Sequence, residues 1–143
     1  MERRKIFLIG LILFFLMKGS FAGEKNFDKY FLSSYPDIIK VILDNKDQLN
    51  LSTTQNEAIE AAISQYEPMI NERKKQIDQL EKDLQDLILH GGESSKIKSI
   101  ILKLAQLKSE NLVLKIKEIR EIQNNLTESQ YKKILSYLEG KSI

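Results

Sequence analysis

A long apolar seam places the tightest constraint on how this 143-residue chain can fold. Between residues 52 and 89, large apolar residues recur at alternating spacings of four and three, and Arg73 stands in the one missing position. This heptad pattern predicts a single long helix that packs lengthwise against another helix. Pro68 lies on the opposite face and predicts a bend, because it removes one backbone hydrogen bond. The seam residues are Ile59, Ile63, Tyr66, Ile70, Ile77, Leu80, Leu84 and Leu87.

The partner helix follows directly along the chain. His90-Gly91-Gly92 predicts a turn, and the serines after it predict a cap for a helix from about Ser95 to Asn124. Its apolar residues form one stripe up to Leu107 and a shifted stripe from Leu112, so we expect more than one neighbour. Residues 52–89 carry eight acidic and four basic side chains, whereas residues 94–125 carry three and seven. Opposite net charges favour antiparallel pairing, although each exposed ion pair contributes only about 0.2–1 kcal/mol.

Two short helices complete the expected fold. Pro36-Asp37 predicts a helix that ends near Lys46, because proline suits an early helical position. A final helix should start after Thr127, with its apolar face formed by Tyr131, Ile134, Leu135 and Leu138. No alternation of apolar and polar residues stands out, so strands are not expected. The predicted fold class is all-α, with four helices that include a long, bent antiparallel hairpin.

The first 22 residues have the pattern of a cleavable export signal. Basic residues at positions 3–5 precede a 12-residue apolar run from Ile6 to Met17, and small residues follow at Ser20 and Ala22. A membrane-spanning helix needs about 20 apolar residues, so the run is short for an anchor. An uncleaved amino-terminal anchor is the alternative. We expect a secretory signal at residues 1–22 and a single helical domain at residues 23–143, without a stable membrane anchor after cleavage.

Removing the signal changes the charge of the chain. The whole sequence has 22 basic and 20 acidic residues, whereas residues 23–143 have 18 and 19. A nearly neutral domain gives no support for nucleic-acid binding. The chain has no cysteine, which excludes disulfides and thiolate metal sites. The domain must therefore be held by packing, and dimerisation is one way for a small domain to bury more surface.

Two of the expected helix starts share one motif. Leu51-Ser52-Thr53-Thr54-Gln55 and Leu126-Thr127-Glu128-Ser129-Gln130 each place a hydroxyl residue at the cap and glutamine three residues later. This spacing predicts a capping box, in which the hydroxyl and the glutamine each satisfy one backbone N–H. The leading leucine can pack forward as a staple, onto Tyr131 in the second copy and onto Ile59 in the first. The motif residues are Leu51, Ser52, Gln55, Leu126, Thr127 and Gln130.

With these two motifs the chain resembles the periplasmic LTxxQ-motif proteins, the Spy/CpxP-like family. The second copy matches the motif fully, the first has Ser52 in place of threonine, and helix order extends the resemblance over about residues 36–140. The resemblance implies a periplasmic, cradle-shaped antiparallel homodimer. It also implies an ATP-independent chaperone whose partners are unfolded or misfolded envelope proteins. The alternative within the family is a stress-signalling adaptor that inhibits a sensor kinase.

A binding role of this kind needs apolar surface beside charge. The second long helix has more apolar residues than one partner helix requires, and lysines flank them. The expected client-binding face comprises Lys96, Ile97, Ile100, Lys103, Leu104 and Lys108. Charge would speed the encounter and apolar contacts would hold the client weakly. Two alternatives stay open: the extra apolar residues form a dimer interface and the seat of the final helix, or the chain is a plain structural coiled coil.

The sequence offers no catalytic constellation, so we expect neither an enzyme nor a cofactor or metal. His90 is the only histidine and lies beside two glycines, where a solvated loop residue is expected. Glu57 with Glu60, or Asp83 with Asp86, could share only a weak cation without further oxygen ligands from a loop. No glycine-rich phosphate loop or nucleophile motif is present.

Overall fold

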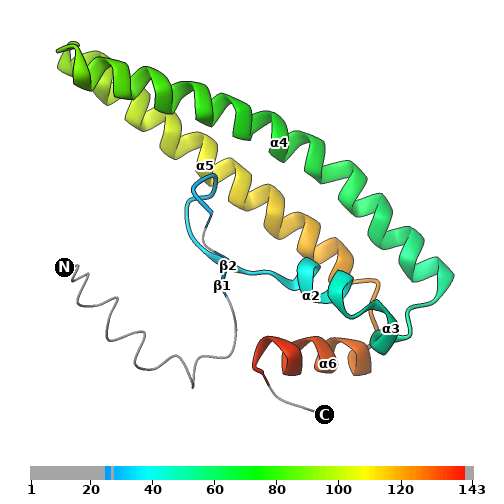
Figure 1. The fold of residues 1–143 in the computed structure, drawn as a ribbon. Coiled ribbons are helices and arrows are strands. Elements are labelled where there is room, and N and C mark those ends of the chain that lie inside the picture. Colours follow the sequence, from blue (N-terminus) through cyan, green and yellow to red (C-terminus); the bar gives the residue numbers. More distant parts are fainter. Residues whose placement is uncertain (1–24, 27, 141–143) are drawn as a thin grey trace.

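The computed structural model describes residues 25–26 and 28–140 of a single chain. Its centre is an antiparallel pair of long helices, α4 (Thr53–Leu89) and α5 (Ser94–Gln123) (Figure 1). Both helices begin and end within one residue of the predicted bounds. The predicted export signal, residues 1–22, lies outside the described residues. Within the described part, no helix combines the length and apolar character needed to cross a membrane.

Ion pairs between α4 and α5 agree with the predicted pairing of an acidic and a basic helix. Arg73 Nε lies 3.1 Å from Glu110 Oε1, so the arginine in the seam meets a carboxylate on the facing helix. Lys108 Nζ lies 3.4 Å from Glu81 Oε2. Pro68 is exposed and α4 continues through it without a break, so the predicted bend stays a prediction.

The described residues form five helices rather than the four predicted, because the first predicted helix is divided. It consists of α2 (Ile38–Asp44) and α3 (Lys46–Leu49). Asp37 caps α2 by accepting a hydrogen bond from the Lys40 N–H at 3.1 Å. Asn45 interrupts the helix, and its side-chain amide donates to the Val41 carbonyl at 2.8 Å. Asparagine competes with regular helical hydrogen bonds in this way, which accounts for the division.

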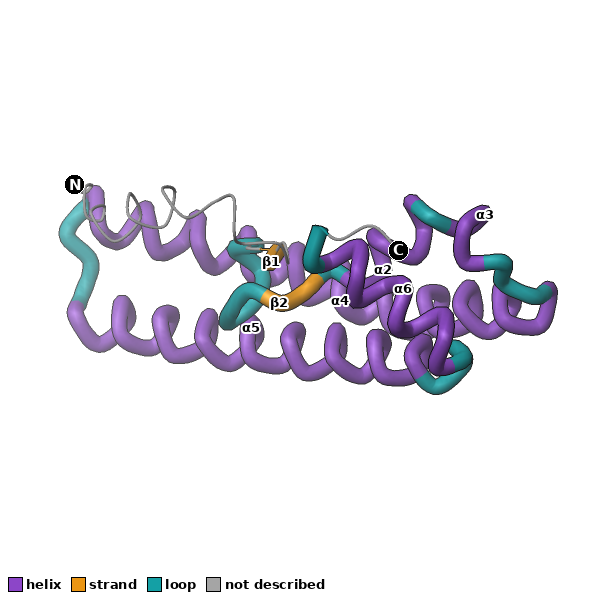
Figure 2. The backbone as a smooth tube through the Cα atoms, turned by 90° about the horizontal axis from the view of Figure 1, so that it is seen from below, coloured by secondary structure: helices purple, strands orange, loops and turns teal. Residues whose placement is uncertain are grey.

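The expectation that the chain has no strands is wrong for one short pair. Strand β1 (Lys25–Asn26) runs antiparallel to β2 (Tyr35–Pro36), with Asn26 opposite Tyr35. Two-residue strands are too short for an alternating pattern to show in the sequence. Figure 2 shows this pair beside the middle of the hairpin, where the segment between the strands reaches the long helices.

The hairpin turn forms at the predicted glycines, but the predicted serine cap is wrong. Gly91 has a positive φ of 74°, and the Gly92 N–H donates to the Leu87 carbonyl at 2.7 Å. This closure of the α4 end leaves Glu93 at the cap position of α5, where its side chain makes no capping hydrogen bond. Ser94 is therefore the first helical residue instead of the cap.

The buried side chains form one main core and a smaller one. The main core joins the short helices, including α6 (Glu128–Leu138), to one end of the hairpin, and its fully buried members include Ile42, Ile70, Ile122 and Ile134. The smaller core lies further along the hairpin and contains Ile77, Leu104 and Leu107. Towards the turn no other described element covers the two helices, and Ile88, Leu89, Ile101 and Leu102 are exposed (Figure 1).

Candidate functional site

Both predicted capping boxes are present. Ser52 Oγ accepts from the Gln55 N–H at 3.1 Å, and the Gln55 side chain accepts from the Ser52 N–H at 2.9 Å. Thr127 and Gln130 repeat the arrangement at the same two distances. The leucines that precede the caps, Leu51 and Leu126, are half-buried and pack against the main core.

The two glutamines also bind each other, which the sequence did not predict. Gln55 Nε2 donates to Gln130 Oε1 at 2.7 Å, and Gln130 Nε2 donates back to Gln55 Oε1 at 3.2 Å. The same two amides donate to the carbonyls of Asn125, at 2.8 Å, and Leu49, at 3.1 Å. We call this pair the glutamine clasp. Because it joins the start of α4 to the start of α6, the repeated motif fixes the fold around the hairpin's open end.

The predicted client-binding residues do not form one exposed face. Lys96 and Lys103 are exposed, whereas Ile97 and Ile100 are half-buried. Leu104 is only 8% exposed and belongs to the smaller core. The half-buried Lys108 pairs with a glutamate of α4, as described above. The large apolar side chains that α5 does expose are, among the described residues, Ile101, Leu102, Val113 and Ile116.

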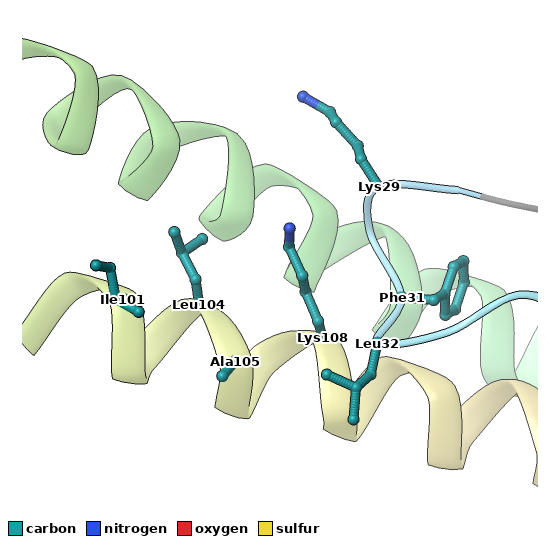
Figure 3. A pocket seen from close by; sticks show the side chains of 7 residues that line it. All are labelled: Lys29, Phe31, Leu32, Ile101, Leu104, Ala105 and Lys108. Carbon is teal, nitrogen blue, oxygen red and sulfur yellow. The ribbon is translucent and has the colours of Figure 1, made fainter. Parts of the chain in front are cut away.

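A segment ahead of β2 lies against the middle of the hairpin and borders an open pocket. We call this segment, residues 28–32, the strap. The pocket has a volume of about 440 Å³, and Figure 3 shows Leu104 and Lys108 pointing from α5 toward α4 while Lys29 extends from the strap toward α4. Phe31 and Leu32 of the strap, with Ile101 and Ala105 of α5, complete its lining.

Charged groups fix the strap on α4. Lys29 Nζ lies 3.0 Å from Glu81 Oε1 and 3.1 Å from Asp78 Oδ1, and these contacts raise the pKa of the Lys29 ammonium. The Tyr30 hydroxyl donates to Asp78 Oδ1 at 2.8 Å, which lowers the pKa of the Asp78 carboxyl and raises that of the Tyr30 phenol. The Lys74 ammonium lies 5.2 Å from the centre of the Tyr30 ring. A lysine followed by a tyrosine therefore matches this acidic edge of α4.

A buried polar row lies inside the hairpin beside the predicted shifted stripe of α5, of which Leu112 is half-buried and Ile119 and Ile122 are buried in the main core. The buried positions of α5 are 104, 107, 111, 115, 118, 119 and 122, and Asn111, Lys115 and Glu118 occupy three of these positions. Lys115 Nζ lies 2.8 Å from Glu118 Oε1 and also pairs with Glu67 of α4. Extending the spacing of three and four residues from Leu104 and Leu107 along α5, through polar positions as well as apolar ones, would have identified this row.

The three ionisable groups of this cluster, Glu118, Glu67 and Lys115, differ in how strongly the protein favours their charged forms. Burial raises the pKa of the Glu118 carboxyl to about 7, against the attraction of Lys115. Burial alone would raise the pKa of Glu67 and lower that of Lys115. Their hydrogen-bonded charges act in the opposite direction and prevail, so the pKa of Glu67 is lowered and that of Lys115 is raised. Near neutral pH, Glu118 is the group in this row that exchanges a proton.

The described residues contain no group of three or more histidine, cysteine or acidic side chains that could hold a metal ion. His90 is exposed beside the turn, and its Nδ1 lies 3.0 Å from the Asp86 carbonyl. The carboxylate pairs considered from the sequence, Glu57 with Glu60 and Asp83 with Asp86, acquire no further carboxylate or imidazole partner in this part of the chain.

Comparisons with protein-family models, with curated proteins and with solved structures found no match for the chain. The resemblance to the LTxxQ-motif proteins therefore rests on the two motifs and on helix order.

Proposed function

We propose that the chain is an ATP-independent periplasmic chaperone that binds unfolded or misfolded envelope proteins through the exposed surface of its hairpin. The observation that carries the proposal is the apolar surface of α5 beside the strap. Leu32, Ile101 and Leu102 are 57%, 50% and 60% exposed, and Lys98 and Lys103 are exposed nearby on α5. Exposed apolar groups gathered among charges are typical of a binding surface.

This surface would act by weak contacts at several points. The exposed lysines attract acidic segments and speed encounter, and the exposed apolar side chains then exclude water from apolar segments of the client. The region towards the turn, where no other described element covers the two helices, offers a long surface to such segments. We propose that two copies form the cradle-shaped antiparallel homodimer that the family resemblance implies, which would double this surface.

Aggregation of a disulfide-containing client after reduction tests the proposal. At a one-to-one ratio and without ATP, the protein should suppress light scattering by the client. The Ile101→Ser and Leu102→Ser double variant should lose most of that effect, because it removes the exposed apolar groups. The matched control is Leu43→Ser, which changes an exposed apolar residue of α2. No suppression at several-fold excess would reject the proposal, and binding to the periplasmic domain of a sensor kinase instead would favour the adaptor.

A further inference from the structure

The strap is held on α4 by ion pairs that are partly or largely open to solvent. The side chains of Lys29 and Asp78, which form one of its ion pairs, are 51% and 52% exposed. Exposed ion pairs are weak because water and salt screen them. Phe31, by contrast, is only 4% exposed and belongs to the main core. The strap therefore has a firm anchor at Phe31, a half-buried Tyr30 that packs against both cores, and an exposed ion-pairing group at Lys29.

On α5, the strap is held through its backbone. The Leu32 N–H donates to the Lys108 carbonyl at 3.2 Å, and Asn111 Nδ2 donates to the Tyr30 carbonyl at 3.3 Å. Asn111 is fully buried, and its Oδ1 has no hydrogen-bond partner among the described residues. A buried amide donor is costly when it is left unpaired. This position of the hairpin therefore requires a backbone carbonyl, which any segment of irregular chain could supply.

The groove continues beyond the strap toward the hairpin turn. A second open pocket, of about 570 Å³, shares Lys29, Leu104 and Lys108 with the first. Its α4 side is lined by the acidic pair of Asp78 and Glu81 together with Lys82 and Gln85, and Leu84 contributes to its apolar part. The two adjoining pockets combine an apolar floor with an acidic edge on one side. Lys29 lies where they meet, so the strap occupies only part of a longer groove.

We propose that this groove binds an unfolded segment in which a basic residue directly precedes an aromatic residue, and that Lys29 and Tyr30 are its internal competitor. The inference rests on the proposed chaperone function and adds the chemistry of the preferred segment and its regulation. The incoming basic residue replaces Lys29 between Asp78 and Glu81. The aromatic residue takes the place of Tyr30 beside α4, and a backbone carbonyl of the segment accepts from Asn111.

Internal competition has a measurable consequence. A tethered competitor acts at an effective concentration in the millimolar range, so a free segment binds the intact protein weakly. The apparent affinity rises in proportion to the fraction of protein in which the groove is free. Removing the two ion pairs of Lys29 and the hydrogen bond of the Tyr30 hydroxyl should increase that fraction by about three- to ten-fold.

The experiment measures the anisotropy of a labelled peptide with the sequence of residues 28–34, DKYFLSS, on titration with the purified protein. The variant Lys29→Ala with Tyr30→Phe should bind the peptide about three- to ten-fold more tightly than the unchanged protein, because its strap competes less. Adding Asp78→Asn and Glu81→Gln to that strap variant should weaken peptide binding relative to the strap variant alone, because the carboxylates that receive the lysine are then neutral. Glu72→Gln is the matched control, because it removes an exposed charge of α4 outside the groove.

A second measurement needs no protein variant and covers the case of a variant that fails to fold. The unchanged protein should prefer DKYFLSS to a peptide with glutamate in place of its lysine, and 0.5 M salt should reduce the difference. Equal binding of the two peptides, or equal affinity of the unchanged protein and the strap variant, overturns the inference. If client aggregation is still suppressed in that case, the chaperone proposal survives. If the peptide binds as expected without suppression of aggregation, the chaperone proposal fails and the groove remains a peptide site.

Discussion

Replacing Glu118 by glutamine should stabilise the protein at pH 8 and remove most of the pH dependence of its stability near neutrality. The Glu118 side chain is fully buried, and Lys115, the cation beside it, is shared with Glu67. Full ionisation therefore places two carboxylates and one ammonium inside the hairpin. Burial of a carboxylate that lacks a full counter-charge favours its neutral form, which accounts for a pKa of about 7.

The size and sign of the effect follow from the two pKa values. The folded pKa of about 7 lies above the ordinary value of 4.5, so the folded protein binds a proton that the unfolded chain releases. The stabilising contribution is fully present below pH 4.5 and is lost as the pH rises through 7. At about 1.4 kcal/mol for each pH unit between the two values, the loss at pH 8 approaches about 3 kcal/mol. Glutamine keeps the shape of the protonated carboxyl and cannot ionise, so the variant avoids this loss.

Urea unfolding followed by far-ultraviolet circular dichroism at pH 5, 6, 7 and 8 measures the free energy of unfolding directly. The two proteins should differ little at pH 5, diverge by about 1.4 kcal/mol for each pH unit up to pH 7, and keep a nearly constant difference above it. Lys115 keeps Glu67 as a partner in the variant, so the substitution leaves no buried charge without a counter-ion. Glu60→Gln, at an exposed position of α4, is the control and should follow the unchanged protein at every pH.

Two results would refute this reasoning. Parallel stability curves for Glu118→Gln and the unchanged protein would mean that Glu118 does not titrate in this range. A variant that is less stable at pH 8 would mean that the attraction of Lys115 for the Glu118 carboxylate exceeds the cost of burying its charge.

Three further predictions concern the architecture. Gln55→Ala and Gln130→Ala should each lower the free energy of unfolding by about 1–3 kcal/mol. In a double-mutant cycle, the sum of the two single losses should exceed the loss of the double variant, because each of the three variants breaks the same glutamine clasp. Ile77→Ala should cost about 2–5 kcal/mol in urea unfolding, because it leaves a cavity in the smaller core. Gly92→Ala should lower the melting temperature, since its added Cβ would lie 2.9 Å from Leu87 Cβ, and the cost should be about 1–3 kcal/mol.

The bounds of the long helices were predictable because their signals are local. A capping box starts α4 at Ser52, another starts α6 at Thr127, and the glycine pair ends α4. Each signal acts within a few residues and does not depend on the rest of the fold. The division of the first helix at Asn45 was missed, because a single asparagine can sit within a helix or interrupt it.

The buried polar row was missed because the pattern of apolar residues points to another face. Ile116 belongs to the predicted shifted stripe, yet it is 43% exposed, whereas Lys115 and Glu118 lie inside. A buried charge becomes plausible only when its partner is known. That partner, Glu67, is 48 positions away from Lys115, and their meeting depends on how α4 and α5 are aligned by the turn.

The glutamine clasp and the position of the strap could not be predicted from local sequence patterns either, because both depend on contacts between residues far apart in the sequence. The motif repeats visibly at Gln55 and Gln130, but its spacing of 75 residues says nothing about contact. Their meeting requires both the length of the hairpin and the path of the short helices. The strap has no periodic pattern at all, and its position follows from contacts such as those of Lys29 and Tyr30 with the middle of α4.

The polar residues inside the hairpin connect its stability to its binding surface. A continuous leucine seam would pack α4 on α5 without buried charge, and such a replacement of buried ion pairs is often stabilising. A leucine at position 111, however, could not donate a hydrogen bond to the Tyr30 carbonyl, so irregular backbone could not lie there without an unpaired group. At the point where the strap contacts the hairpin, a polar side chain therefore takes the place of an apolar one that would pack α4 against α5. The same polar row that makes Glu118 sensitive to pH provides the buried donor that a groove for irregular chain needs.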